Sequence, residues 1–128
     1  MPNRPLISVV DDDESVRESL EGLIRSVGFR GKVFASAEEF LKSNHLDDID
    51  CLILDVRMPG MSGIELYDHL LANHFVIPVI FITAHGSDEA VRSQLMNRGA
   101  VDYLLKPFSE EALLNAIDKA LGPKGRGN

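Results

Sequence analysis

Five short apolar runs recur along the chain, and longer segments with helical periodicity separate them. The runs cover residues 6–10, 32–34, 51–54, 79–83 and 101–105. The first, third and fourth runs are almost continuously apolar instead of alternating between polar and apolar side chains. Strands that are buried on both faces show this pattern, and such strands usually belong to a parallel sheet.

The segments between the runs carry helical stripes and helix-start signals. Apolar residues at positions 16, 20, 23, 24 and 27 share one face of a helix, and residues 64–71 carry a second stripe. Ser36 and Glu39 form a capping-box pattern that predicts the start of a short helix. Ser87 and Ser109 are predicted to cap the last two helices, the second of which should end at Gly122.

This alternation of strands and helices predicts the fold class. Five βα units joined by right-handed crossovers give an α/β fold, a doubly wound (βα)5 three-layer sandwich with a parallel five-stranded sheet. The units occupy residues 6–121, which we interpret as one domain after an N-terminal tail at residues 1–5. Three glycines and one proline fall within residues 122–128, which predicts a flexible tail or the start of a linker.

Composition narrows the class of protein. With 128 residues, of which 45% are hydrophobic, the chain can build the core of one domain. The net charge of −7 disfavours direct binding of nucleic acid by this domain. The single cysteine excludes an intrachain disulfide and fits a reducing cytoplasm, where we expect the protein to reside. No apolar run reaches the roughly 20 residues of a membrane span, so no membrane partner is expected.

Chemically versatile residues follow four of the five predicted strands. They are Asp11 and Asp12 after the first strand, Asp55 after the third, Thr83 at the end of the fourth and Lys106 after the fifth. Open α/β sheets bind ligands beyond the carboxyl ends of their strands, so these residues should converge. Clustered carboxylates need a cation or proton between them, and hard oxygen ligands favour Mg²⁺. A lysine and a hydroxyl beside them suit a phosphoryl group, which predicts Mg²⁺-assisted phosphoryl chemistry with Asp55 as the candidate nucleophile.

Each of these residues also has a simpler interpretation. The acidic run at residues 11–14 can cap the first helix, and we expect Asp13 to do so in either case. Asp55 can form a turn, Thr83 can simply end a strand, and Lys106 can be a solvated surface residue. A coincidence at four strand ends is much rarer than any one of these alone, which favours a shared site.

Several enzyme classes lack their signatures here. No P-loop and no glycine-rich dinucleotide motif follows the first strand, and the four histidines show no zinc spacing. A haloacid-dehalogenase-like phosphatase would carry Asp-x-Asp at its nucleophile, whereas Arg57 stands two places after Asp55. A binding module that has lost its chemistry is disfavoured by the intact set of strand-end residues. Among these classes, the residues therefore favour metal-assisted phosphoryl chemistry at the strand ends.

Four segments carry a family resemblance. They are Val-Val-Asp-Asp-Asp at 9–13, Leu-Asp-Val-Arg-Met-Pro-Gly at 54–60, Ile-Thr-Ala at 82–84 and Tyr-Leu-Leu-Lys-Pro-Phe at 103–108. In this order they resemble the CheY-like receiver domain of two-component response regulators, over residues 6–121. Residues 10–14, 83–86 and 99–103 make the chain most similar to the FixJ-type subgroup. The resemblance implies a strand order of 2-1-3-4-5 and a phosphorylation switch, not an enzyme with a separate substrate.

The resemblance also implies the roles of the site residues. Asp55 would accept a phosphoryl group from a phosphohistidine on a sensor histidine kinase. Mg²⁺ would be held by Asp11, Asp12, Asp55 and the backbone carbonyl of Arg57. Lys106, which would precede a cis peptide bond, would pair with the phosphoryl oxygens.

Thr83 and Tyr103 are the implied switch residues. Thr83 would bond to the phosphoryl group, and Tyr103 would then turn inward, although it can also simply fill the core and FixJ-type members often carry phenylalanine there. Arg57 and His85 flank the site, and we hypothesise that they tune the lifetime of the phosphoaspartate.

The output is implied by the subgroup. The face of the fourth helix, fifth strand and fifth helix would relay the signal, with a phosphorylation-dependent homodimer as one outcome. FixJ-type receivers usually precede a helix-turn-helix DNA-binding domain, and the residues after Leu121 cannot hold one. We therefore expect contact with DNA only through an output domain absent from this chain. The alternative is a stand-alone receiver that acts through protein–protein contacts.

Overall fold

The computed structural model describes residues 4–44, 46–84 and 89–125, and its elements alternate as the sequence predicts. In chain order they are β1 (Leu6–Val10), α1 (Glu14–Ser26), β2 (Arg30–Phe34), α2 (Ala37–Lys42), a 3-10 turn (Leu46–Asp48), β3 (Cys51–Asp55), α3 (Gly63–Ala72), β4 (Val79–Thr83), α4 (Glu89–Asn97), β5 (Asp102–Leu105) and α5 (Glu110–Gly125). The strands form one parallel sheet in the order β2-β1-β3-β4-β5. The predicted fold class and strand order are thus confirmed.

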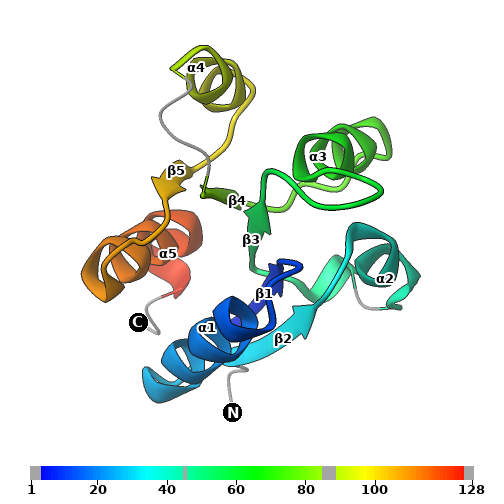
Figure 1. Ribbon diagram of the computed structural model, residues 1–128. Helices are drawn as coiled ribbons and strands as arrows, with labels where there is room; N and C mark the ends of the chain where they lie inside the picture. Colours follow the sequence, from blue (N-terminus) through cyan, green and yellow to red (C-terminus); the bar gives the residue numbers. More distant parts are fainter. Residues whose placement is uncertain (1–3, 45, 85–88, 126–128) are drawn as a thin grey trace.

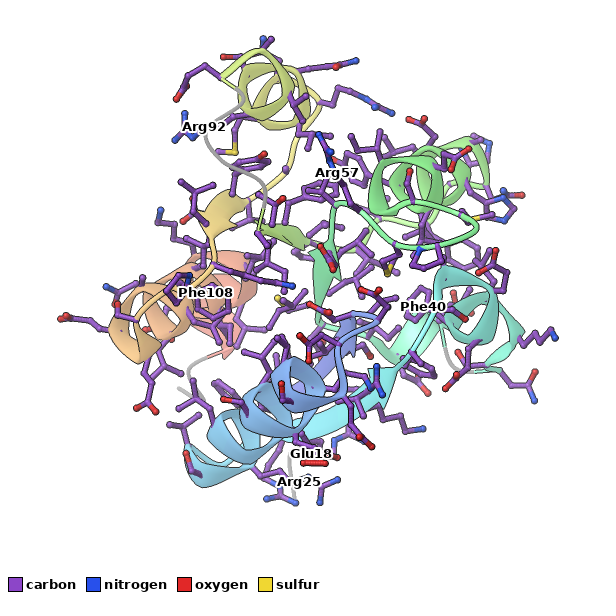
Figure 2. The ribbon with its side chains drawn as sticks, in the orientation of Figure 1. Glu18, Arg25, Phe40, Arg57, Arg92 and Phe108 are labelled. Carbon is purple, nitrogen blue, oxygen red and sulfur yellow. The ribbon has the colours of Figure 1, made fainter. Side chains whose placement is uncertain are left out.

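Helices cover both faces of this sheet (Figure 1). α1 and α5 pack on one face, and α2, α3 and α4 pack on the other. Every residue of β1, β3 and β4 is buried, as their continuous apolar pattern predicts. Phe40 of α2 and Phe81 of β4 are the largest fully buried side chains on the α2–α4 face, and Figure 2 shows how closely side chains fill the layers.

The boundaries differ from prediction at the polar ends of elements. β2 begins at Arg30 instead of residue 32, because Arg30 and Gly31, which add no apolar side chain to the pattern, pair with Leu6 and Ile7 of β1 through the backbone. β3 extends to Asp55, and β5 begins one residue later than predicted, at Asp102. Backbone pairing, which apolar periodicity does not report, decides these ends.

Helix caps follow local side-chain chemistry. Ser36 accepts a hydrogen bond from the backbone of Glu39, as predicted, and Ser109 likewise accepts one from the backbone N–H of Ala112. A complete capping box between Ser62 and Glu65, which was not among the predicted helix starts, opens α3. α5 loses helical geometry at its predicted end, where Gly122 has a φ of 65°. The predicted cap Ser87 lies outside the described residues.

The described helices are short or polar. Within the described ranges, none is both long and apolar enough to cross a membrane.

Candidate functional site

The fold brings the strand-end residues together at one edge of the sheet. Asp11 directly follows β1, Asp55 ends β3, Thr83 ends β4, and Lys106 directly follows β5. These four strands are consecutive neighbours in the sheet, so their carboxyl ends lie side by side. The order of the strands therefore brings residues that are spread over almost 100 positions of the sequence into one cluster.

Three carboxylates form the centre of this cluster. One oxygen from each of Asp11, Asp12 and Asp55 lies within 4.8 Å of the other two. Asp11 and Asp55 are buried, whereas Asp12 is exposed. Asp13 does not join them, because its carboxylate caps α1 through the backbone N–H groups of Ser15 and Val16. The acidic run thus divides into a helix cap and a site, and the capping role expected for Asp13 is confirmed.

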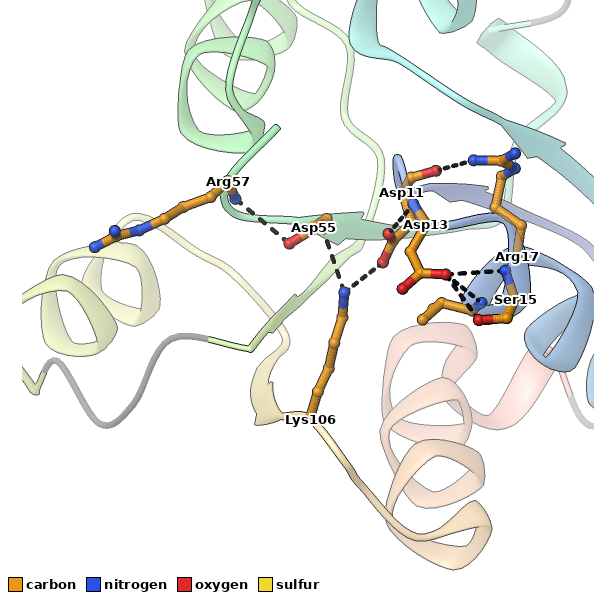
Figure 3. Close-up of polar contacts among 8 residues, drawn as sticks. Asp11, Asp13, Ser15, Arg17, Asp55, Arg57 and Lys106 are labelled. Carbon is orange, nitrogen blue, oxygen red and sulfur yellow. Dashed lines mark hydrogen bonds and ion pairs between the residues drawn. The ribbon is translucent and has the colours of Figure 1, made fainter. Parts of the chain in front are cut away.

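Lys106 supplies the positive charge of the cluster (Figure 3). Its Nζ lies 2.8 Å from Asp11 Oδ2 and 3.4 Å from Asp55 Oδ2. Burial alone would lower the pKa of Lys106, but its close contact with the Asp11 carboxylate and the charge of Asp55 outweigh burial and raise it. The peptide bond from Lys106 to Pro107 is cis, as the family resemblance implies.

Asp55 is held in an environment that disfavours its charge. Burial, followed by the neighbouring charge of Asp11, raises the pKa of Asp55 to about 6, while Lys106 opposes the rise. Its Oδ1 accepts a hydrogen bond of 3.4 Å from the backbone N–H of Arg57. The site therefore contains more negative charge than its one lysine neutralises, which is the electrostatic condition for binding a cation.

The donor set can be tested against a divalent cation. Asp11 Oδ2 is buried and, although it is close to the Lys106 ammonium, has no aligned hydrogen bond from any described group. Mg²⁺ takes oxygen ligands at about 2.0–2.1 Å in octahedral geometry, so its ligands lie up to about 4.2 Å apart. Small side-chain movements would close the 4.8 Å cluster to that size. The residues present therefore fit a small, hard divalent cation.

The remaining predicted residues surround this centre. Thr83 is buried at the end of β4, and Tyr103 is only 8% exposed and packs with the α2–α4 core. The side chain of Arg57 points away from Asp55 toward α4, so its backbone is the part that faces the site (Figure 3). His85 lies outside the described residues.

Three positioning contacts were not predicted from the sequence. Arg17 of α1 donates a hydrogen bond of 2.7 Å to the backbone carbonyl of Asp11. Glu38 of α2 accepts a hydrogen bond of 3.0 Å from the backbone of Met61, in the loop after β3. Gly63 has no room for a side chain, since a Cβ there would lie 2.0 Å from the Asp55 carbonyl oxygen. The glycine at the start of α3 was the one feature of the sequence that could have indicated this close approach of the backbone.

Comparison with known proteins agrees with this geometry. The family model described as the response regulator receiver domain matches residues 7–118. Nodulation protein W of Bradyrhizobium diazoefficiens is 46% identical over 114 residues, which cover 89% of this chain and 50% of that protein. Response regulator protein TodT of Pseudomonas putida is 44% identical over 125 residues, covering 96% of this chain and 55% of that protein. The chain thus spans about half the length of these curated relatives.

Solved structures give the same result. The response regulator StyR superposes with a TM-score of 0.85 at 50% identity, over 92% of this chain and 59% of that one. FixJ-N superposes with a TM-score of 0.80 at 38% identity, over 94% and 95% of the two chains. The match to the family model, the fold and the strand-end cluster lead to one conclusion: this chain belongs to the response regulator receiver domain family, with FixJ-type proteins among its relatives.

Proposed function

We propose that this domain is a phosphorylation switch that accepts a phosphoryl group on Asp55. The observation that carries the proposal is the pairing at the sheet edge of a buried aspartate with a lysine 3.4 Å away and two further carboxylates. A nucleophile, a cation for the phosphoryl oxygens and a set of metal ligands are the parts that phosphoryl transfer requires. The donor of the phosphoryl group is proposed to be a phosphohistidine on a sensor histidine kinase.

The positions of the side chains support the following route for the transfer. A carboxylate oxygen of Asp55 attacks the phosphorus atom, the P–N bond to the donor histidine breaks, and the imidazole leaves with the electron pair. Lys106 loses its contact with Asp55 and pairs with the phosphoryl oxygens. Mg²⁺, held by Asp11, Asp12, Asp55 and the backbone carbonyl of Arg57, would neutralise charge on the transferring group. Asp11 and Asp12 would then counter the cation instead of repelling the phosphoryl group.

The response is proposed to spread from Thr83 to the face formed by α4, β5 and α5. Thr83 ends β4 and would hydrogen-bond to the phosphoryl group, which draws the segment after β4 toward Asp55. Tyr103 stands on the neighbouring strand, paired with Phe81, and is packed inward in this structure. This face would be the element that changes between two states, and an output domain or a second copy of the chain would bind one of them.

The output is proposed to be control of transcription. FixJ and other relatives carry names of transcriptional regulators, and this chain covers 57% of the length of FixJ of Azorhizobium caulinodans. A DNA-binding domain outside these 128 residues would then be the element controlled. A stand-alone receiver, acting through contacts with other proteins, is the alternative that the same site supports.

Intact mass after incubation with acetyl phosphate tests the proposal. We expect the gain of one phosphoryl group in the wild type with Mg²⁺ and no gain without it. Asp55→Asn should gain nothing, and Asp47→Asn, which changes an exposed aspartate outside the site, should behave like the wild type. A folded wild-type domain that gains no mass with Mg²⁺, or an Asp55→Asn variant that gains as much, would contradict the proposal.

A further inference from the structure

A basic pocket lies at the edge of the sheet opposite Asp55. It is lined by Arg4, Leu6, Arg25, Phe29, Arg30, Gly31 and Lys32 and has a volume of about 370 Å³. The residues come from the amino ends of β1 and β2 and from the end of α1. Because β1 has five residues, the pocket is about 16 Å from the phosphoacceptor edge. It is therefore separate from the cluster around Lys106.

The charge of this pocket differs from that of the whole chain. Four of its seven lining residues are cationic and none is acidic, whereas the chain as a whole has a net charge of −7. Of these four cations, only Arg25 has a carboxylate partner among the described residues, Glu21 at 2.9 Å. No described carboxylate pairs with Arg4, Arg30 or Lys32. A concave site with unpaired cations concentrates anions.

The backbone holds these cations close to one another. The Arg30 Nε donates a hydrogen bond of 2.9 Å to the backbone carbonyl of Arg4, and Leu6 pairs with Arg30 in the sheet. Arg25 reaches toward the carbonyl of Gly31, and Figure 2 shows it projecting outward from α1. Like-charged side chains gathered in this way repel one another until an anion lies between them.

We propose that this pocket binds a small ligand that carries phosphate groups. Guanidinium groups form paired hydrogen bonds with carboxylates and phosphates alike, but a phosphate group carries more negative charge and a third acceptor oxygen, so it can neutralise and bond to several of these cations at once. A volume of about 370 Å³ is within the range of small-molecule sites, and Phe29 and Leu6 add apolar surface for the rest of the ligand. The acidic remainder of the domain would repel a long polyanion, so a small phosphate-bearing ligand is favoured over nucleic acid.

The test is an NMR titration of the ¹⁵N-labelled 128-residue chain with inorganic pyrophosphate, with EDTA to remove divalent metals. We expect saturable amide shifts confined to Arg4, Leu6 and residues 29–32. The variant Arg4→Gln/Lys32→Gln removes two exposed cations whose side chains make no described hydrogen bond, and we expect about tenfold weaker binding or more. Lys42→Gln makes one such charge change on α2, outside the pocket, and should bind as the wild type does.

Two further ligands identify the source of the phosphate. ADP that binds at the same amides as tightly as pyrophosphate, or more tightly, supports a nucleotide-like ligand. Pyrophosphate that binds more tightly than ADP supports a simple phosphate ligand. A DNA duplex that shifts these amides at lower concentration than either would overturn the small-ligand proposal in favour of nucleic acid. If no saturable shifts appear, or if Lys42→Gln weakens binding as much as the double variant does, the proposal that this pocket binds phosphate is overturned.

Discussion

The carboxyl and amino edges of the sheet carry groups of opposite charge, and β1 contributes to both. At the carboxyl edge, three carboxylates form a cluster, and the two that are buried, Asp11 and Asp55, pair with Lys106. At the amino edge, four cations line an open pocket, and they are exposed and largely unpaired. The function of a buried, paired cluster depends on the positions of its individual atoms. The function of an exposed cluster depends mainly on its total charge. Substitutions at the carboxyl edge should therefore have larger effects and depend less on salt.

The largest expected difference is in the rate of phosphorylation after substitution of a lysine. Lys106→Met removes the cation beside Asp55, and the loss of one charge-stabilising group should slow phosphorylation by acetyl phosphate by about 10²–10³-fold. Lys42→Met, an exposed lysine on α2, should leave the rate unchanged. The rates can be measured by intact mass against time with saturating Mg²⁺. Equal rates in the two variants would remove Lys106 from the proposed chemistry.

A pair of glycines tests how tightly the carboxyl edge is packed. Gly63→Ala places a Cβ against the Asp55 carbonyl oxygen, and we expect the free energy of unfolding to fall by about 2–3 kcal/mol. At Gly22, on the exposed surface of α1, a Cβ meets nothing within 4 Å, and alanine should stabilise the domain by about 0.5–1 kcal/mol. Chemical denaturation measures both changes. Stabilisation by Gly63→Ala would contradict the described geometry.

Metal binding should stabilise the domain through the acidic cluster. At tenfold excess over its Kd, Mg²⁺ would add about 1.4 kcal/mol to the free energy of unfolding, because it binds the folded state. Asp12→Asn removes one exposed ligand without disturbing a buried contact and should reduce this gain, whereas Glu18→Gln on the surface of α1 should not. Melting curves over a Mg²⁺ titration provide the measurement. An undiminished response in Asp12→Asn would exclude it as a ligand.

The smallest expected effect is a change in the stability of the metal-free domain with pH. Because the pKa of Asp55 is raised to about 6 in the folded domain, the folded state holds a proton that the unfolded chain releases near pH 4. The contribution of Asp55 to stability is therefore present at low pH and is lost as the pH rises through about 6. Asp55→Asn should lack this part of the pH dependence. Denaturation midpoints of both proteins in EDTA from pH 4 to pH 7 would show it, and parallel curves would contradict it.

The carboxyl edge was much easier to predict than the amino edge. Continuous apolar runs locate β1, β3 and β4, and a residue placed directly after such a run must lie at the edge of a parallel sheet. The structure places Asp11 and Asp55 together at this edge as predicted, along with Lys106, which follows the fifth apolar run. The boundaries of the domain at residues 6 and 121 remain a prediction.

The sequence could not show contacts made across elements. Arg17 and Glu38 look like ordinary charged positions of surface helices, and only the fold places them against the backbone of the site. The cations of the amino edge likewise form no run in the sequence, because they come from three separate segments. β2 was predicted too short for the same reason, since backbone pairing at its polar residue Arg30 leaves no apolar pattern.

The most direct test of the central claim is to locate the phosphoryl group. Borohydride reduces an acyl phosphate to an alcohol, so peptide mapping after treatment with acetyl phosphate, Mg²⁺ and borohydride marks the modified carboxylate. The account predicts the mark at Asp55 alone, with none at Asp11 or Asp12. A mark at either of those residues, with Asp55 unmodified, would contradict it.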